Sequence, residues 1–125
     1  MTTSRITLYF PRGRTCEVEV TLTEAACVVV HSSVEWDLNN DCPRTLMNEW
    51  SISQYPTGHR MFDGIPSKEG AIQCANKFLA LKQFVGISIH EFLTTNLTSA
   101  EIQEGKNAIV AAYDFILDLR SGLQP

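Results

Sequence analysis

The side chains best suited to holding a small anionic ligand lie together in one short segment of this sequence. Residues 55–60 carry an aromatic ring, a hydroxyl, an imidazole and a guanidinium, contributed by Tyr55, Thr57, His59 and Arg60. Pro56 presets φ and Gly58 supplies a left-handed residue, so together they predict a turn with backbone amides. Arg60 could hold a phosphate through two parallel N–H groups. A plain hairpin turn with polar side chains is the alternative interpretation.

A predicted helix begins shortly after this segment and adds a second source of anion-binding groups. Ser67 is a suitable N-cap, and Lys68 then opens the helix, whose first amides point toward solvent. These two features place a candidate ligand site at Tyr55, Thr57, Gly58, His59, Arg60 and Lys68.

No arrangement in the sequence predicts catalysis. His31 precedes Ser32 and Ser33 in a predicted strand, where successive side chains point to opposite faces, so adjacency does not make a catalytic pair. Glu17 and Glu19 share the polar face of a strand, which predicts a solvated surface. Neither common phosphate-binding loop motif occurs. We therefore expect no catalytic residues, no metal and no cofactor.

Two further groups of residues are weaker candidates for ligand contact. Arg12 and Arg14 flank a second turn, and basic turns are usually solvated. Trp36 stands at a strand–loop boundary and could lie on a binding surface, whereas Trp50 begins a strand and is expected in the core.

Composition and charge exclude several classes of protein. The formal net charge of −4 argues against binding nucleic acid, which needs a basic face. No stretch is long and apolar enough to span a membrane, and the first ten residues lack a signal-peptide pattern. Four cysteines at irregular spacings predict reduced thiols rather than disulfides or zinc ligands. We expect a cytoplasmic protein with no membrane partner.

The first half of the chain has the patterns of strands. Alternation of apolar and polar residues is clearest over 16–22, where one face is expected to be wet. A polar loop is predicted over 36–43, because turn-forming residues are dense there. The remaining predicted strands cover 6–10, 26–34, 50–55 and 59–62.

The second half has helical spacing. The first predicted helix runs from Lys68 to about Phe84 and could end at Gly86. Residues 87–95 fit either a short helix or an edge strand. Thr98 and Glu101 form a capping box that starts the last helix. Its buried seam is predicted at Ile102, Ile109 and Ile116, with small residues at Gly105 and Ala112 that permit close packing.

Strands followed by helices predict an α+β fold. We expect an N-terminal antiparallel sheet of about four to five strands and two main C-terminal helices. The length suits a single domain over residues 1–125.

The segment from Trp50 to Phe62 contains an aromatic-Pro-Thr-Gly turn and precedes a helix that opens with residues 68–71, Lys-Glu-Gly-Ala. This arrangement resembles the type 1 Thoeris anti-defence family of phage proteins. Members of that family are non-enzymatic sponges, which bind cyclic ADP-ribose isomers made by bacterial TIR-domain proteins and so starve a downstream effector. The resemblance implies sequestration of such a nucleotide signal in the host cytoplasm.

The family also implies a dimer or larger homo-oligomer. Its pocket uses aromatic, amide and arginine side chains, some from the C-terminal helical region at a subunit interface. The residues of those types in this chain are Phe92, Asn107 and Arg120. Small size, acidic charge and the lack of a catalytic motif suit an alternative equally well, namely a protein-interaction inhibitor such as an anti-CRISPR or other anti-defence protein.

Overall fold

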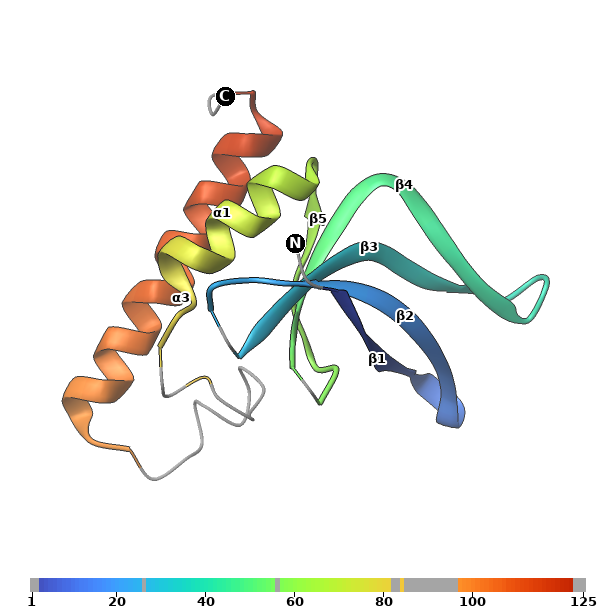
Figure 1. The fold of residues 1–125 in the computed structure, drawn as a ribbon, viewed down its shortest axis with the longest axis horizontal. Coiled ribbons are helices and arrows are strands. Elements are labelled where there is room, and N and C mark those ends of the chain that lie inside the picture. Colours follow the sequence, from blue (N-terminus) through green and yellow to red (C-terminus); the bar gives the residue numbers. More distant parts are fainter. Residues whose placement is uncertain (1–2, 26, 56, 82–83, 85–96, 123–125) are drawn as a thin grey trace.

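The computed structural model of the 125-residue chain describes residues 3–25, 27–55, 57–81, 84 and 97–122. Five strands form one antiparallel sheet in chain order, and two helices follow (Figure 1). The fold is therefore α+β, which confirms the prediction from sequence. The elements are β1 Thr3–Phe10, β2 Arg14–Leu22, β3 Val28–Asp37, β4 Cys42–Gln54, β5 Arg60–Ile65, α1 Lys68–Phe78 and α3 Ser99–Arg120.

Both helices begin where their capping residues predict. The Ser67 hydroxyl accepts a hydrogen bond from Gly70 N at 3.0 Å, and Glu69 lies in the first turn. The Thr98 hydroxyl accepts from Glu101 N, while the Glu101 carboxylate accepts from Thr98 N. These local bonds satisfy amides that the helix itself leaves without partners.

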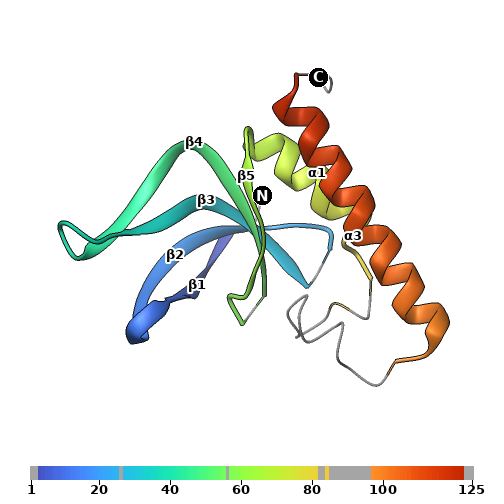
Figure 2. The ribbon, with the colours of Figure 1, turned by 180° about the vertical axis from the view of Figure 1, so that it is seen from behind.

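The two helices lie side by side and pack on one side of the sheet (Figures 1 and 2). Ala112 and Ile116 of α3 are buried there, Ile109 packs against them, and Ile102 is partly buried. Of the predicted seam, Ile109 and Ile116 therefore pack on the core, whereas Ile102 at its N-terminal end is only partly buried. The Cys74 thiol of α1 lies 3.8 Å from the carbonyl oxygen of Ala112, so the small side chain at 112 permits close approach. No helix among the described residues is long and apolar enough to cross a membrane.

Three boundaries predicted from sequence are wrong, and one of them is the start of the strand predicted over 50–55, which begins at Cys42 as β4. The first helix ends at Phe78 instead of continuing to about Phe84, because Leu79 leaves the helical region at φ −109° and ψ 9°. The departure lets Leu79 and Phe84 both enter the core. Gly86 and residues 87–95 lie outside the described residues.

The loop predicted over 36–43 is also wrong, because strand pairing continues through most of it. Trp36 pairs with Pro43 and Asp37 with Cys42, which leaves only residues 38–41 for the turn. Pro43 is tolerated because it stands near the start of β4, where a missing amide costs little.

The sheet is strongly curled, so its two ends approach each other. Register shifts occur between Ser32 and Val34 of β3 and within the pairing of β4 with β5. Such irregularities increase the bend and twist of a strand. A second apolar cluster, the β-side cluster, fills the concave side, and its buried members are Ile6, Leu8, Val20, Val29 and Val34.

Gly58 is the point at which the curled sheet closes. It lies in the turn between β4 and β5 at φ +80°, and a methyl group there would overlap the carbonyl oxygen of Thr7 in β1. Gly13 has a similar φ of +73°, but a methyl group there would meet nothing within 4 Å. The first strand and the last turn are thus packed backbone to backbone only because residue 58 has no side chain.

We expect Gly58→Ala to destabilise the fold far more than Gly13→Ala. Both changes carry the cost of a left-handed alanine, about 1–2 kcal/mol. Gly58→Ala must also move β1, which should raise its cost to about 3 kcal/mol or more. Urea unfolding of the two variants measures the difference, and equal costs would contradict the closure of β1 on this turn.

Candidate functional site

The tips of two hairpins meet at the end of the sheet away from the helices. The β1–β2 tip brings Phe10 and Arg14, and β3 brings Trp36. Between them lies a hollow of about 460 Å³, here called the arginine hollow. Its lining residues are Phe10, Pro11, Arg12, Arg14, Glu35, Trp36, Leu38 and Arg60.

Two guanidinium groups flank a pair of aromatic rings along this hollow. The guanidinium carbon of Arg60 lies 4.6 Å from the ring centroid of Phe10. The Phe10 and Trp36 centroids are 5.6 Å apart. Arg14 then lies over Trp36, 5.3 Å from its centroid. Cation–π attraction holds each arginine against a ring. The four residues come from four different strands and form one row in the order cation, ring, ring and cation.

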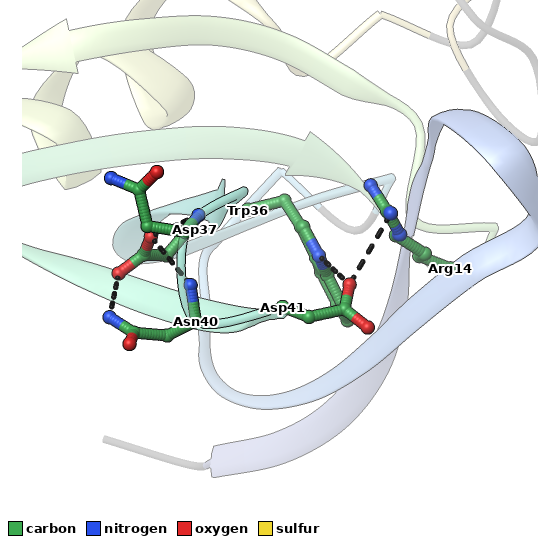
Figure 3. Close-up of polar contacts among 6 residues, drawn as sticks. Arg14, Trp36, Asp37, Asn40 and Asp41 are labelled. Atoms are coloured by element: carbon green, nitrogen blue, oxygen red, sulfur yellow. Dashed lines mark hydrogen bonds and ion pairs between the residues drawn. The ribbon is translucent and has the colours of Figure 1, made fainter.

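Asp41 joins this row from the turn between β3 and β4 (Figure 3). Trp36 Nε1 donates to Asp41 Oδ1 at 3.0 Å, and Arg14 Nη2 lies 3.3 Å from the same oxygen. One carboxylate oxygen therefore occupies the point on which an indole N–H and a guanidinium converge.

The turn itself is shaped by another carboxylate, that of Asp37. Its Oδ1 accepts from the backbone amides of Asn39 at 3.0 Å and Asn40 at 3.3 Å, and its Oδ2 accepts from Asn40 Nδ2 at 2.8 Å (Figure 3). The bonds from Asn40 chiefly lower the pKa of Asp37. The conformation of the turn thus rests on Asp37 and does not require Asp41.

The arginine hollow carries positive charge on a chain that is acidic overall. Arg12, Arg14 and Arg60 line it. The opposing carboxylate of Glu35 forms an ion pair with Arg44, on the neighbouring strand. A local excess of guanidinium groups suits an anion, even where the net charge of the protein is negative.

Most polar groups of the turn over 55–60 bond within the protein. Gln54 Oε1 accepts from the Thr57 hydroxyl at 3.0 Å and lies 3.3 Å from His59 Nδ1. Gln54 O accepts from Gly58 N at 2.9 Å, and Tyr55 packs against the β-side cluster. Arg60 is the residue of this segment that lines the arginine hollow.

The other predicted site residues lie elsewhere. Lys68 stands over Trp50, 5.7 Å from the ring centroid. Asn107 is exposed on α3 and accepts from Gln103 at 2.8 Å. Arg120 donates to the carbonyl oxygens of Asp63 and Gly64, and so fastens the end of α3 to β5. Phe92 lies outside the described residues. The structure does not gather Lys68, Asn107 and Arg120 around Arg60.

A second hollow, the sheet cleft, opens where β2 and β3 part. The register of these strands contains the pairs Thr21–Val30 and Leu22–Val29, beyond which they diverge. The cleft has a volume of about 420 Å³. Its charged lining residues are Glu17, Glu19 and Lys68. Because both signs of charge are present, the cleft suits an anion less well than the arginine hollow does.

His31 has the hydrogen bonds of a catalytic histidine, and although it lines the sheet cleft it is only 2% exposed. Its Nδ1 lies 2.7 Å from Ser32 O, which can only accept, so Nδ1 carries the proton. Nε2 then accepts from the Ser53 hydroxyl at 2.8 Å. Both side chains are buried, and the pair joins β3 to β4. Burial is the main cause that lowers the pKa of His31.

The same concave face holds a second hydrogen-bonded chain. The hydroxyls of Ser33 and Ser51 are 2.7 Å apart, and Ser51 donates to Asp63 Oδ1 at 2.5 Å. This chain links β3, β4 and β5 beside His31. Polar side chains can be buried there because each has a partner.

The two buried cysteines, Cys27 and Cys74, are inert thiols at neutral pH. All four are free thiols, and Cys27 and Cys74 are buried. Burial raises the pKa of Cys74 to about 12 and also raises the pKa of Cys27, so both stay protonated at neutral pH. Within the described residues, no group of three or more His, Cys, Asp or Glu side chains could hold a metal ion.

Sequence reasoning gave Phe10 no role and gave Arg12, Arg14 and Trp36 a minor one. The signal available was the basic turn directly after Phe10, and a tryptophan directly before a polar turn. Nothing in the sequence indicated that the two turns meet in space.

No family model, no curated protein and no solved structure matches this chain.

The buried His31 should make stability depend on pH in one direction. Its folded pKa lies below the ordinary value of 6.5, so the unfolded state binds the proton more readily. The stability that the folded protein keeps while His31 is neutral is fully present above about pH 6.5. As the pH falls below this value, the free energy of unfolding decreases with a slope of up to about 1.4 kcal/mol per pH unit. His31→Gln should flatten the slope measured by urea unfolding between pH 7.5 and 5.

The same change at His59, a half-buried residue of the β4–β5 turn, controls for the general loss of an imidazole. If both variants lost the same slope, burial of His31 would not be its source.

Proposed function

We propose that this protein binds a small phosphate-bearing ligand with a flat ring, of the cyclic ADP-ribose type, and sequesters it unchanged. The observation that supports the proposal is the row of Arg60, Phe10, Trp36 and Arg14 along one hollow. A nucleotide-type ligand needs cations for its phosphates and an aromatic face for its base, and the row offers both.

The chemistry of each part fits such a ligand. Arginine binds phosphate oxygens with a planar fork of donors and remains charged at any physiological pH. Phe10 and Trp36 offer faces on which a base can stack. The hollow of about 460 Å³ falls in the size range typical of small-molecule sites.

Sequestration without reaction is the form of the function that the site supports best. The serine–histidine pair of Ser53 and His31 is buried and does not line the arginine hollow. The resemblance to the type 1 Thoeris anti-defence family supplies the biological setting. In the cytoplasm of an infected bacterium, a phage-encoded protein of this kind would remove the nucleotide signal before it reached the host effector.

Arg60→Ala and Arg14→Ala should each weaken the binding of cyclic ADP-ribose by at least about tenfold. A charge-assisted hydrogen bond is worth about 1.5–3 kcal/mol, and tenfold corresponds to about 1.4 kcal/mol. Isothermal titration calorimetry measures the affinities. Lys68→Ala is the matched control, because it removes a cation that lines the sheet cleft instead.

Three outcomes count against the proposal. Absence of binding in the wild-type protein would contradict the ligand class. A loss confined to Lys68→Ala would move the site to the sheet cleft. Chromatography of the ligand released by heating should recover it intact, and recovery of a cleaved product would indicate an enzyme.

We also infer that the protein forms a homo-oligomer through α3. Val110, Tyr113 and Leu117 lie three and four residues apart on one side of this helix and are 59%, 51% and 39% exposed. A stripe of this kind commonly marks an interface. Closed two-fold pairs are the commonest homo-oligomers, so we expect a dimer or a larger assembly built from it.

Leu117→Asp should convert the oligomer to a monomer at micromolar concentration. The change places a carboxylate within the stripe, where the second copy would bury it without a partner. Light scattering measures the mass, and Asn107→Asp adds the same charge at another exposed position of α3 as the control. A wild-type monomer would contradict the inference, and a bound host protein would favour the alternative function of a protein-interaction inhibitor.

A further inference from the structure

We propose that the Asp41 carboxylate occupies an anion position at the edge of the arginine hollow, on two of its lining residues, and that a ligand phosphate binds by displacing it. The inference rests on the proposed function, because it identifies which atoms receive the phosphate. Asp41 would then be a specificity-determining residue, and the phosphate would take its place on Arg14 and Trp36.

Two donors converge on one oxygen of Asp41. Trp36 Nε1 and Arg14 Nη2 reach the same oxygen, Asp41 Oδ1, at 3.0 and 3.3 Å. Trp36 belongs to β3 and Arg14 is the first residue of β2, so each donor is held by its own strand. Two donors from separate strands aimed at one point form an anion position that the phosphate oxygen of a ligand could also fill.

The Asp41 side chain lies on the solvent side of Arg14. Its side chain is 73% exposed, whereas that of Arg14 is 26% exposed. The carboxylate therefore covers the arginine from the solvent side, and an incoming ligand meets it first. Exposed ion pairs contribute little to stability because water screens them, so the carboxylate can be displaced at low cost.

The turn does not need the Asp41 side chain to keep its shape, because Asp37 holds it. Asp37 accepts from the amides of Asn39 and Asn40, and these bonds do not involve the Asp41 side chain (Figure 3). Asp41 has a positive φ of 51°, a conformation that asparagine also tolerates. Asp41→Asn therefore removes the charge without forcing a change in the backbone.

Displacement of a carboxylate selects the chemical class of the ligand. An incoming group must compete with a carboxylate of charge −1 that is tethered in place. Phosphate monoesters and pyrophosphates carry more charge and more acceptor oxygens, so they compete better than a carboxylate or a neutral nucleoside. The site should thus prefer a pyrophosphate-bearing ligand to adenosine.

The test compares Asp41→Asn with Asp114→Asn by calorimetry, with inorganic pyrophosphate, cyclic ADP-ribose and adenosine as the probes. The two variants lose the same charge, but Asp41 touches Arg14 and Trp36, whereas Asp114 is exposed on α3 and does not line the arginine hollow. Removal of a competing exposed ion pair should tighten the binding of both phosphate probes to Asp41→Asn by about fivefold. The affinity for adenosine should stay unchanged, and Asp114→Asn should stay within about twofold of wild type for all probes.

The outcomes separate this inference from the proposed function. If cyclic ADP-ribose binds and Arg60→Ala weakens it, but Asp41→Asn binds no more tightly than wild type, Asp41 does not compete and only the present inference is overturned. Weaker binding by Asp41→Asn would make Asp41 a positioning residue for Arg14 and Trp36. If neither wild type nor Asp41→Asn binds a phosphate probe, both proposals fall together.

Discussion

The contact between Gly58 and the backbone of Thr7 is the constraint on which the rest of this structure depends. An antiparallel sheet in simple chain order leaves β1 far from the β4–β5 turn unless it curls. Because residue 58 has no side chain, the turn can lie directly on β1 and close the concave face. That closure encloses Ile6 and Leu8 in the β-side cluster and leaves the other face of the sheet to the helices.

The arginine hollow is a consequence of the same curl. Its arginines and rings come from four strands, and in a flat sheet Arg60 of β5 would lie three strands away from Arg14 of β2. Curling brings the end of β1 to both β3 and β5, so that Phe10 contacts Trp36 on one side and Arg60 on the other. The cations then face one hollow, where their charges add instead of being scattered over the surface.

The features that could be predicted from sequence are those set by local bonds. Ser67 and Thr98 cap helices through residues three positions later. The alternation predicted from the strand period holds over 16–20, whereas Thr21, expected on the wet face, is buried. The loop expected over 36–43 was wrong because its turn-forming residues belong partly to paired strands. Arg60 could be singled out by type, but its neighbours Phe10 and Trp36 lie far from it in the chain. Their meeting depends on the curl, which arises from bulges and from a glycine contact that no short motif encodes.

The indole N–H signals of the two tryptophans test the central claim most directly, since Trp36 lines the arginine hollow and Trp50 lies in the sheet cleft. A titration of the ¹⁵N-labelled protein with cyclic ADP-ribose, followed by proton–nitrogen correlation spectra, reports on both rings at once, and Trp50→Phe assigns them. The account predicts that the Trp36 signal moves progressively to saturation while the Trp50 signal stays in place. Movement of the Trp50 signal alone, or of neither, would contradict a nucleotide site in the arginine hollow.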